Sequence, residues 1–194
     1  MTVTAADILP IPEFLRLKPL LARESLANSG ARRVKLGGHL LFLFENEGTV
    51  RWQVQEMCRV ENIVSPAGIQ HELDTYNALL PSRTPTGVEL SATLLVQYTD
   101  EAERNVAVRA LLGLHEHVFI EVDGRRYLAS FDGEQFNTER ISAVQFVRFP
   151  LPQQAFSAFA DLSRCARLLC THPAHPAEVA LPAGFRGAIV EDLG

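Results

Sequence analysis

Residues 88–98 constrain the fold of this chain more than any other segment, because apolar side chains occupy almost every second position. Successive side chains of a β-strand point to opposite faces, so a period of two predicts a strand with one buried face. Such a strand needs neighbouring strands and an apolar layer over its buried face. The positions concerned are Val88, Leu90, Ala92, Leu94, Val96 and Tyr98.

Turn residues elsewhere predict strands that could pair with it. Gly37-Gly38 and Asp123-Gly124 each separate two apolar runs, which is typical of β-hairpins. We expect the segment 88–98, both strands of the second hairpin and a further strand at 141–149 to share one mostly antiparallel sheet. The predicted strands are 33–36, 39–45, 88–98, 117–122, 126–131, 141–149 and a short one at 168–171.

Helices are predicted between these strands, and Pro19 is expected to break or kink the first of them. Strands joined by hairpins and interrupted by helix pairs favour an α+β fold, with a mainly antiparallel sheet and helices packed against it. We expect one domain spanning residues 1–194, in which a helical N-terminal region (1–80) and a sheet-rich region (88–150) share one core and a C-terminal tail covers 166–194. The predicted helices are 12–28, 47–61, 65–80, 100–112 and 152–165.

Composition narrows the class of protein. The 194 residues are 47% hydrophobic and 21% charged, as in a soluble globular protein. A net charge of −5 with scattered basic residues argues against nucleic acid as a partner. The sequence shows neither a signal peptide nor an apolar run long enough to span a membrane. Three sparse cysteines form no disulfide framework, so a cytoplasmic protein is expected.

A polar cluster is predicted where the apolar run 40–44 meets the helix 47–61. Glu45 follows the run, Gln53 falls close to the inward face of the helix, and Glu56 lies further round. Amide and carboxylate groups near a core must be hydrogen-bonded, because burying them without partners is costly. One interpretation is a pocket in which these groups meet a ligand or metal. The other, which we favour, is a structural network that ties the helix to neighbouring strands.

Arg148 lies in the apolar strand predicted at 141–149, where a guanidinium needs a carboxylate partner. We predict an Arg148–carboxylate pair, with Glu56 as the first choice of partner and Glu45 as the second. Glu89 is expected as a further neighbour of the same cluster.

Four blocks of sequence occur in an order that resembles an uncharacterised bacterial family, known only as a domain of unknown function of about this length. The resemblance implies a cytosolic redox or oxidative-stress setting, because members are often encoded beside rubrerythrin and an iron–sulfur oxidoreductase. It therefore implies rubrerythrin or an iron–sulfur protein as a protein partner, and it supplies no catalytic residue. The blocks are FENEGTVRWQVQEM (44–57), HELDTYN (71–77), ELSATL (89–94) and ISAVQFVRFPL (141–151).

Histidines are the candidate metal ligands. His115 and His117 would project to one face of a strand, which Glu121 shares, but a zinc or iron site needs a further ligand. His172 lies near Cys170 at a spacing that matches no standard zinc module. We therefore expect no metal and no cofactor, and keep His115, His117 and His172 only as weak candidates.

Standard catalytic motifs are absent from the sequence, which has no glycine-rich phosphate loop, G-x-S-x-G, H-E-x-x-H or C-x-x-C. Cys58 extends the apolar stripe of its helix, so it is predicted to be reduced, buried and inert. Whether the chain is an enzyme stays open. The leading hypothesis is a non-catalytic accessory or partner protein in a redox or oxidative-stress context. The alternative is a small-ligand or metal-binding enzyme whose polar pocket is lined by the helix at 45–61.

Overall fold

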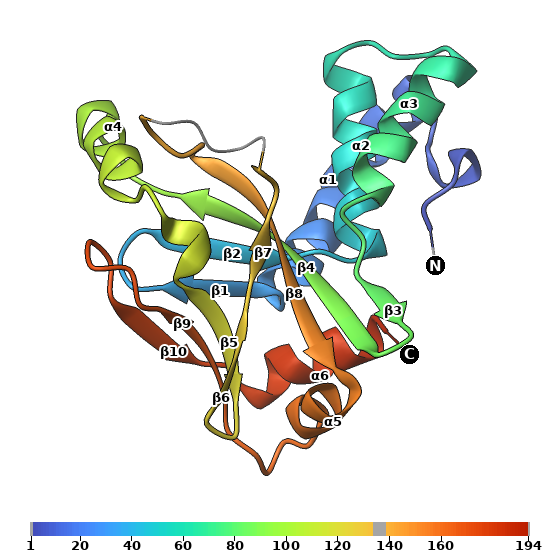
Figure 1. The fold of residues 1–194 in the computed structure, drawn as a ribbon. Coiled ribbons are helices and arrows are strands. Elements are labelled where there is room, and N and C mark those ends of the chain that lie inside the picture. The colour runs from blue at the N-terminus through green and yellow to red at the C-terminus, as the bar shows by residue number, and fades with distance from the viewer. Residues whose placement is uncertain (1, 134–138, 194) are drawn as a thin grey trace. The chain divides into compact units, whose positions relative to one another are not determined.

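The computed structural model describes residues 2–133 and 139–193, and the chain divides into two compact units (Figure 1). Unit 1 comprises Met1–Ala31 and Glu45–Leu80, and unit 2 comprises Arg32–Phe44 and Pro81–Gly194. Helices make up unit 1, whereas unit 2 contains two antiparallel sheets together with helices. The predicted α+β class is confirmed. The single-domain organisation stays a prediction.

Unit 1 is built around α2, which contacts α1 on one side and α3 on another. The apolar stripe predicted on α2 is confirmed, because Val50, Val54 and Cys58 are almost completely buried. They pack with Leu73 of α3 and with apolar residues that flank the helices. The elements of this unit are η1 (Ala5–Asp7), α1 (Ile11–Gly30), α2 (Glu47–Val60) and α3 (Pro66–Asn77).

The helix α1 runs through Pro19 without a break, contrary to the prediction that this residue would interrupt it. Proline removes one backbone donor from a helix, but here its ring lies on the exposed side. The opposite side is anchored by Phe14, which is fully buried and meets the ring of Trp52 edge-on at 5.7 Å. Packing of that face therefore holds the helix together across the proline.

Unit 2 contains a six-stranded sheet in which β1, β2, β4, β8 and β7 are neighbours in that order, and β3 pairs with the start of β4. A four-stranded sheet has the order β10-β9-β5-β6. The strands are β1 (Arg33–Leu36), β2 (Leu40–Phe44), β3 (Ser82–Thr84), β4 (Gly87–Val96), β5 (Val118–Val122), β6 (Arg125–Leu128), β7 (Ser130–Phe131), β8 (Val144–Pro152), β9 (Ala166–Cys170) and β10 (Ala177–Ala180).

The two sheets enclose one apolar core. Only Ala129 separates β6 from β7, so one stretch of chain leaves the smaller sheet and enters the larger one. At the other edges, β10 contacts β1, and the imidazole Nε2 of His175 lies 3.0 Å from the carbonyl oxygen of Leu36. The core also receives side chains from the helices α4 (Glu101–Ala110), α5 (Gln153–Ala160) and α6 (Ala183–Glu191) and from η2 (Leu114–Glu116).

The expectation of one sheet is wrong. β4 and β8 pair over nine residues, but β5 and β6 belong to the smaller sheet. The reason is that β5 pairs with β9, the short strand predicted at 168–171, whose partner the sequence did not indicate. The C-terminal segment 166–194 also supplies β10 and α6, which the sequence did not predict. No helix in the described part of the chain is both long and apolar enough to cross a bilayer.

Candidate functional site

The start of α2 holds the polar cluster that the sequence predicts. Glu45 is 1% exposed, and its Oε2 accepts hydrogen bonds from the Thr49 hydroxyl and from Gln53 Nε2, the latter at 3.0 Å. Thr49 and Gln53 follow Glu45 by four and eight residues, so both donors lie on the same side of the first two helical turns. The structure thus brings Glu45 and Gln53 together, and it adds Thr49 as a member that the prediction missed.

Further hydrogen bonds, made by Asn46, stabilise the N-terminus of α2. Asn46 caps α2, because its Oδ1 accepts from the Thr49 backbone N–H while its own N–H donates to the Thr49 hydroxyl, both at 2.9 Å. The Asn46 side chain also exchanges two hydrogen bonds, of 3.0 and 3.1 Å, with that of Asn28 on α1. A Cβ atom at Gly48 would lie 2.7 Å from Asn28 Nδ2, so glycine leaves room for this close approach.

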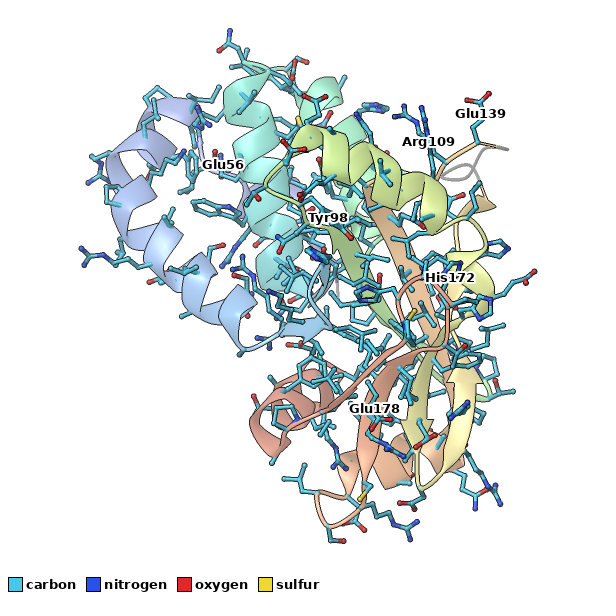
Figure 2. All side chains as sticks on the ribbon, turned by 90° about the vertical axis from the view of Figure 1, so that its left-hand side faces the viewer. Glu56, Tyr98, Arg109, Glu139, His172 and Glu178 are labelled. Atoms are coloured by element: carbon cyan, nitrogen blue, oxygen red, sulfur yellow. The ribbon has the colours of Figure 1, made fainter. Side chains whose placement is uncertain are left out.

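Further along α2, Gln55 and Glu56 bind other segments of unit 1. The amide of Gln55 pairs with both backbone polar groups of Leu9, accepting at 2.7 Å and donating at 3.0 Å. Glu56 lies between α1 and α2 (Figure 2), with Lys18 Nζ 2.8 Å from one carboxylate oxygen and Arg59 Nη2 2.7 Å from the other. Partial burial opposes its ionisation, but the hydrogen bonds from Arg59 and Lys18 outweigh this and lower the pKa of Glu56.

The carboxylate that Arg148 contacts is Glu89, through Nη1 and Oε1 at 3.0 Å. The first-choice partner, Glu56, is instead bonded to Lys18 and Arg59. The register of β4 and β8 explains the observed pair, because it sets Ser91 opposite Arg148 and brings Glu89 to the diagonal position on the same face. Both side chains are about one-third exposed, so the apolar setting predicted for the guanidinium is not found.

The histidine candidates are not arranged as the sequence suggested. His115 lies in η2, and β5 begins only at Val118, so His115 and His117 do not share a strand face. His117 Nδ1 lies 3.0 Å from Thr171 Oγ1, and its ring meets that of His172 edge-on at 5.1 Å. The segments around His117 and His172 are therefore brought together by pairing of β5 with β9.

Both ring nitrogens of His172 face backbone groups. Nε2 lies 2.9 Å from the Leu112 carbonyl oxygen, and Nδ1 accepts from the Ala174 N–H at 3.2 Å. Burial raises the pKa of the neighbouring Cys170 thiol, which favours the neutral form. Among the residues that the structure describes, no three histidine, cysteine or acidic side chains are grouped as metal ligands would be.

Glu121, expected on the same face as the histidines, is bonded by two arginines on neighbouring strands. Its Oε2 accepts from Arg126 Nε at 3.1 Å, and its Oε1 accepts from Arg167 Nη2 at 2.5 Å. Hydrogen bonds from Arg126 and then Arg167 lower the pKa of this carboxyl. Its role in the fold is to join β6, β5 and β9.

The fold and the site define an α+β protein. The buried or half-buried carboxylates described above, those of Glu45, Glu56 and Glu121, accept hydrogen bonds from side chains of the same chain. The chain belongs to the DUF3501 family, proteins of unknown function, whose sequence profile matches residues 2–193. It is similar to a solved structure of a protein of unknown function from Burkholderia pseudomallei K96243, with 31% identity, full coverage of both chains and a TM-score of 0.88. Among curated proteins, none matches.

Proposed function

We propose that this chain is a non-catalytic accessory or partner protein that works in a cytosolic redox or oxidative-stress context. The observation that carries the proposal is the use of the α2 polar groups within unit 1. Glu45 holds Thr49 and Gln53, and Glu56 holds two cations from α1 and α2. Groups that bond to their own helices are poorly placed to bind and turn over a substrate.

The redox setting rests on the family resemblance, which implies rubrerythrin or an iron–sulfur protein as the partner. Neighbouring genes indicate that proteins work in the same process, but they do not show what each protein does. A direct binding measurement is therefore the informative test. The purified, untagged chain would be titrated against purified rubrerythrin and iron–sulfur oxidoreductase from the same gene neighbourhood, with an unrelated acidic protein as the control. We expect saturable binding to one of the two redox proteins and none to the control.

The alternative is a small-ligand or metal-binding enzyme with a pocket lined by α2, and elemental analysis distinguishes it. Protein purified without a histidine tag should contain far less than one equivalent of zinc, iron or manganese per chain. A stoichiometric metal that survives dialysis, together with no binding to either redox protein, would replace the accessory role with the enzymatic one.

A further inference from the structure

The helix α1 carries an apolar surface that unit 1 does not cover. Leu15 is 52% exposed and Leu26 is 62% exposed, and Pro19 and Ala22 lie between them on the same line. The spacing of four, three and four residues places all four on one side of a helix. We call Leu15, Pro19, Ala22 and Leu26 the α1 stripe. It lies about a third of a turn from Phe14, which is fully buried against Trp52.

The exposure of these leucines is not needed for the fold of α1. The helix is already anchored through Phe14, and Lys18 joins it to Glu56 of α2. Two exposed leucines with Pro19 and Ala22 between them add nothing to stability in water, whereas apolar side chains at this spacing match the seam along which two helices pack. Pro19 also has no N–H, so the Leu15 carbonyl on the same side cannot receive its usual helical hydrogen bond and can accept one from a partner.

Arginine side chains border the stripe on one side. Arg16 and Arg23 follow Leu15 and Ala22 directly, seven residues apart, and lie along one border. Lys18 lies along the other border, where its ammonium group is bonded to Glu56 at 2.8 Å. The acidic residues Glu13 and Glu24 fall on the far side of the exposed surface, about half a turn from the stripe.

This charge pattern selects the kind of partner. If two copies of the chain paired antiparallel through the stripe, the border with Arg16 and Arg23 would face the same border of the second copy. A membrane surface would require a broader basic face, yet the chain has a net charge of −5 and two of the acidic residues lie on this same helix. The stripe is complemented by a helix whose apolar side chains are bordered by carboxylates that meet Arg16 and Arg23.

We propose that the α1 stripe is a docking surface for an acidic amphipathic helix of a partner protein, a helix-on-helix mode of recognition. The inference rests on the proposed accessory role and specifies the surface through which it would act. The apolar contacts supply affinity, and the arginines select for acidic borders on the partner.

The test uses two designed helical peptides and the full-length chain. One peptide has four leucines at the spacing of the stripe with glutamates at both borders, and the other has lysines in place of those glutamates. Each is labelled with fluorescein, and binding is followed by fluorescence anisotropy at low and high salt. We expect the acidic peptide to bind roughly tenfold or more tightly than the basic one at low salt, a difference that salt reduces.

Variants assign the binding to the stripe. The double change Leu15→Ser and Leu26→Ser should weaken binding of the acidic peptide about tenfold or more, because two anchoring leucines are lost. Leu20→Ser is the matched control, since Leu20 is 57% exposed on the same helix but lies off the stripe, and it should bind as the wild type does. The change Arg16→Glu with Arg23→Glu should shift the preference toward the basic peptide. Emission of Trp52 and far-ultraviolet circular dichroism confirm that each variant is folded.

Several results would overturn the docking surface. These are equal affinity for the two peptides, wild-type binding by the Leu15 and Leu26 variant, self-association that this variant abolishes, and binding to phosphatidylserine vesicles that it abolishes. If a redox protein binds the intact chain and Leu15→Ser with Leu26→Ser does not affect that binding, the accessory role survives and only this surface is wrong. If neither redox protein binds but the acidic peptide still binds through the stripe, the identity of the partner is wrong and the surface stands.

Discussion

Replacing Arg186 should destabilise unit 2 more than any other single change of a charged residue in α6. Its side chain is buried, with only 3% exposed, and its guanidinium donates to backbone carbonyls where α5 ends. The donor–acceptor distances are 2.7 Å to Phe159, 2.7 Å to Arg164 and 2.6 Å to Asp161, with a longer contact of 3.4 Å to Ala158. Burial lowers the pKa of Arg186, and the carbonyls at the negative end of α5 compensate part of that cost.

The magnitude follows from these bonds. A hydrogen bond to a charged group contributes about 1.5–3 kcal/mol, and a buried carbonyl left without a donor costs about 1–3 kcal/mol. Arg186→Met keeps much of the volume but removes three short bonds, so we expect a loss of about 3–5 kcal/mol in the free energy of unfolding. Arg186→Lys should lose less, because an ammonium group can still reach one or two of the carbonyls.

Urea unfolding followed by circular dichroism measures the loss. Arg164→Met is the matched control, since Arg164 is half exposed and pairs with Asp123 and Asp161 at the surface, and its urea midpoint should stay close to that of the wild type. If Arg186→Met and Arg164→Met unfold at the same urea concentration, the carbonyl cluster does not hold α5 and α6 together as argued.

Three further outcomes follow from the structure. Gly87→Ala should destabilise the protein by more than about 2 kcal/mol in urea unfolding, since a Cβ atom there would lie 2.1 Å from the Leu151 carbonyl oxygen. The lowered pKa of Glu121 means that its contribution to stability is present above the unfolded value of 4.5 and is lost as pH falls through the lower folded value. The urea midpoints of wild type and Glu121→Gln should therefore converge progressively as the pH falls below 4.5. A thiol reagent should label exposed Cys165 rapidly and Cys58 slowly under native conditions, because Cys58 is buried and burial raises its pKa.

The sequence predicted those elements whose signals are local. The period-two pattern of β4 and the apolar stripe of α2 each arise from neighbouring residues, and the strand and the buried helix face are found where expected. The prediction that only one face of β4 is buried is wrong, because Ser91 and Thr93 on the other face are buried as well. The division into two sheets was missed, because it depends on pairing of β5 with β9 across more than 40 residues. Nothing in the sequence of β5 indicates which of several apolar strands will be its neighbour.

The candidate site shows the same limit. Glu45 and Gln53 could be grouped from helical spacing, since both lie near the start of α2. The partners of Glu56 and Arg148 could not, because Lys18 comes from another helix and Glu89 is set by strand register. Thr49 was within reach of the sequence, because an Asn and a Thr three residues apart are typical of a helix cap.

The central claim is that the polar cluster at the start of α2 serves the fold, and Glu45→Ala tests it most directly. This change removes the buried acceptor of the Gln53 amide and the closer of the two acceptors of the Thr49 hydroxyl, which keeps the Asn46 carbonyl oxygen at 3.0 Å. We therefore expect a loss of about 1–3 kcal/mol in urea unfolding. Glu61→Ala, an exposed change at the other end of the helix, is the control and should cost less than about 0.5 kcal/mol. The folded Glu45→Ala protein should bind its redox partner with wild-type affinity. Unchanged stability combined with lost binding of a partner, ligand or metal would contradict the claim and identify the cluster as a binding site.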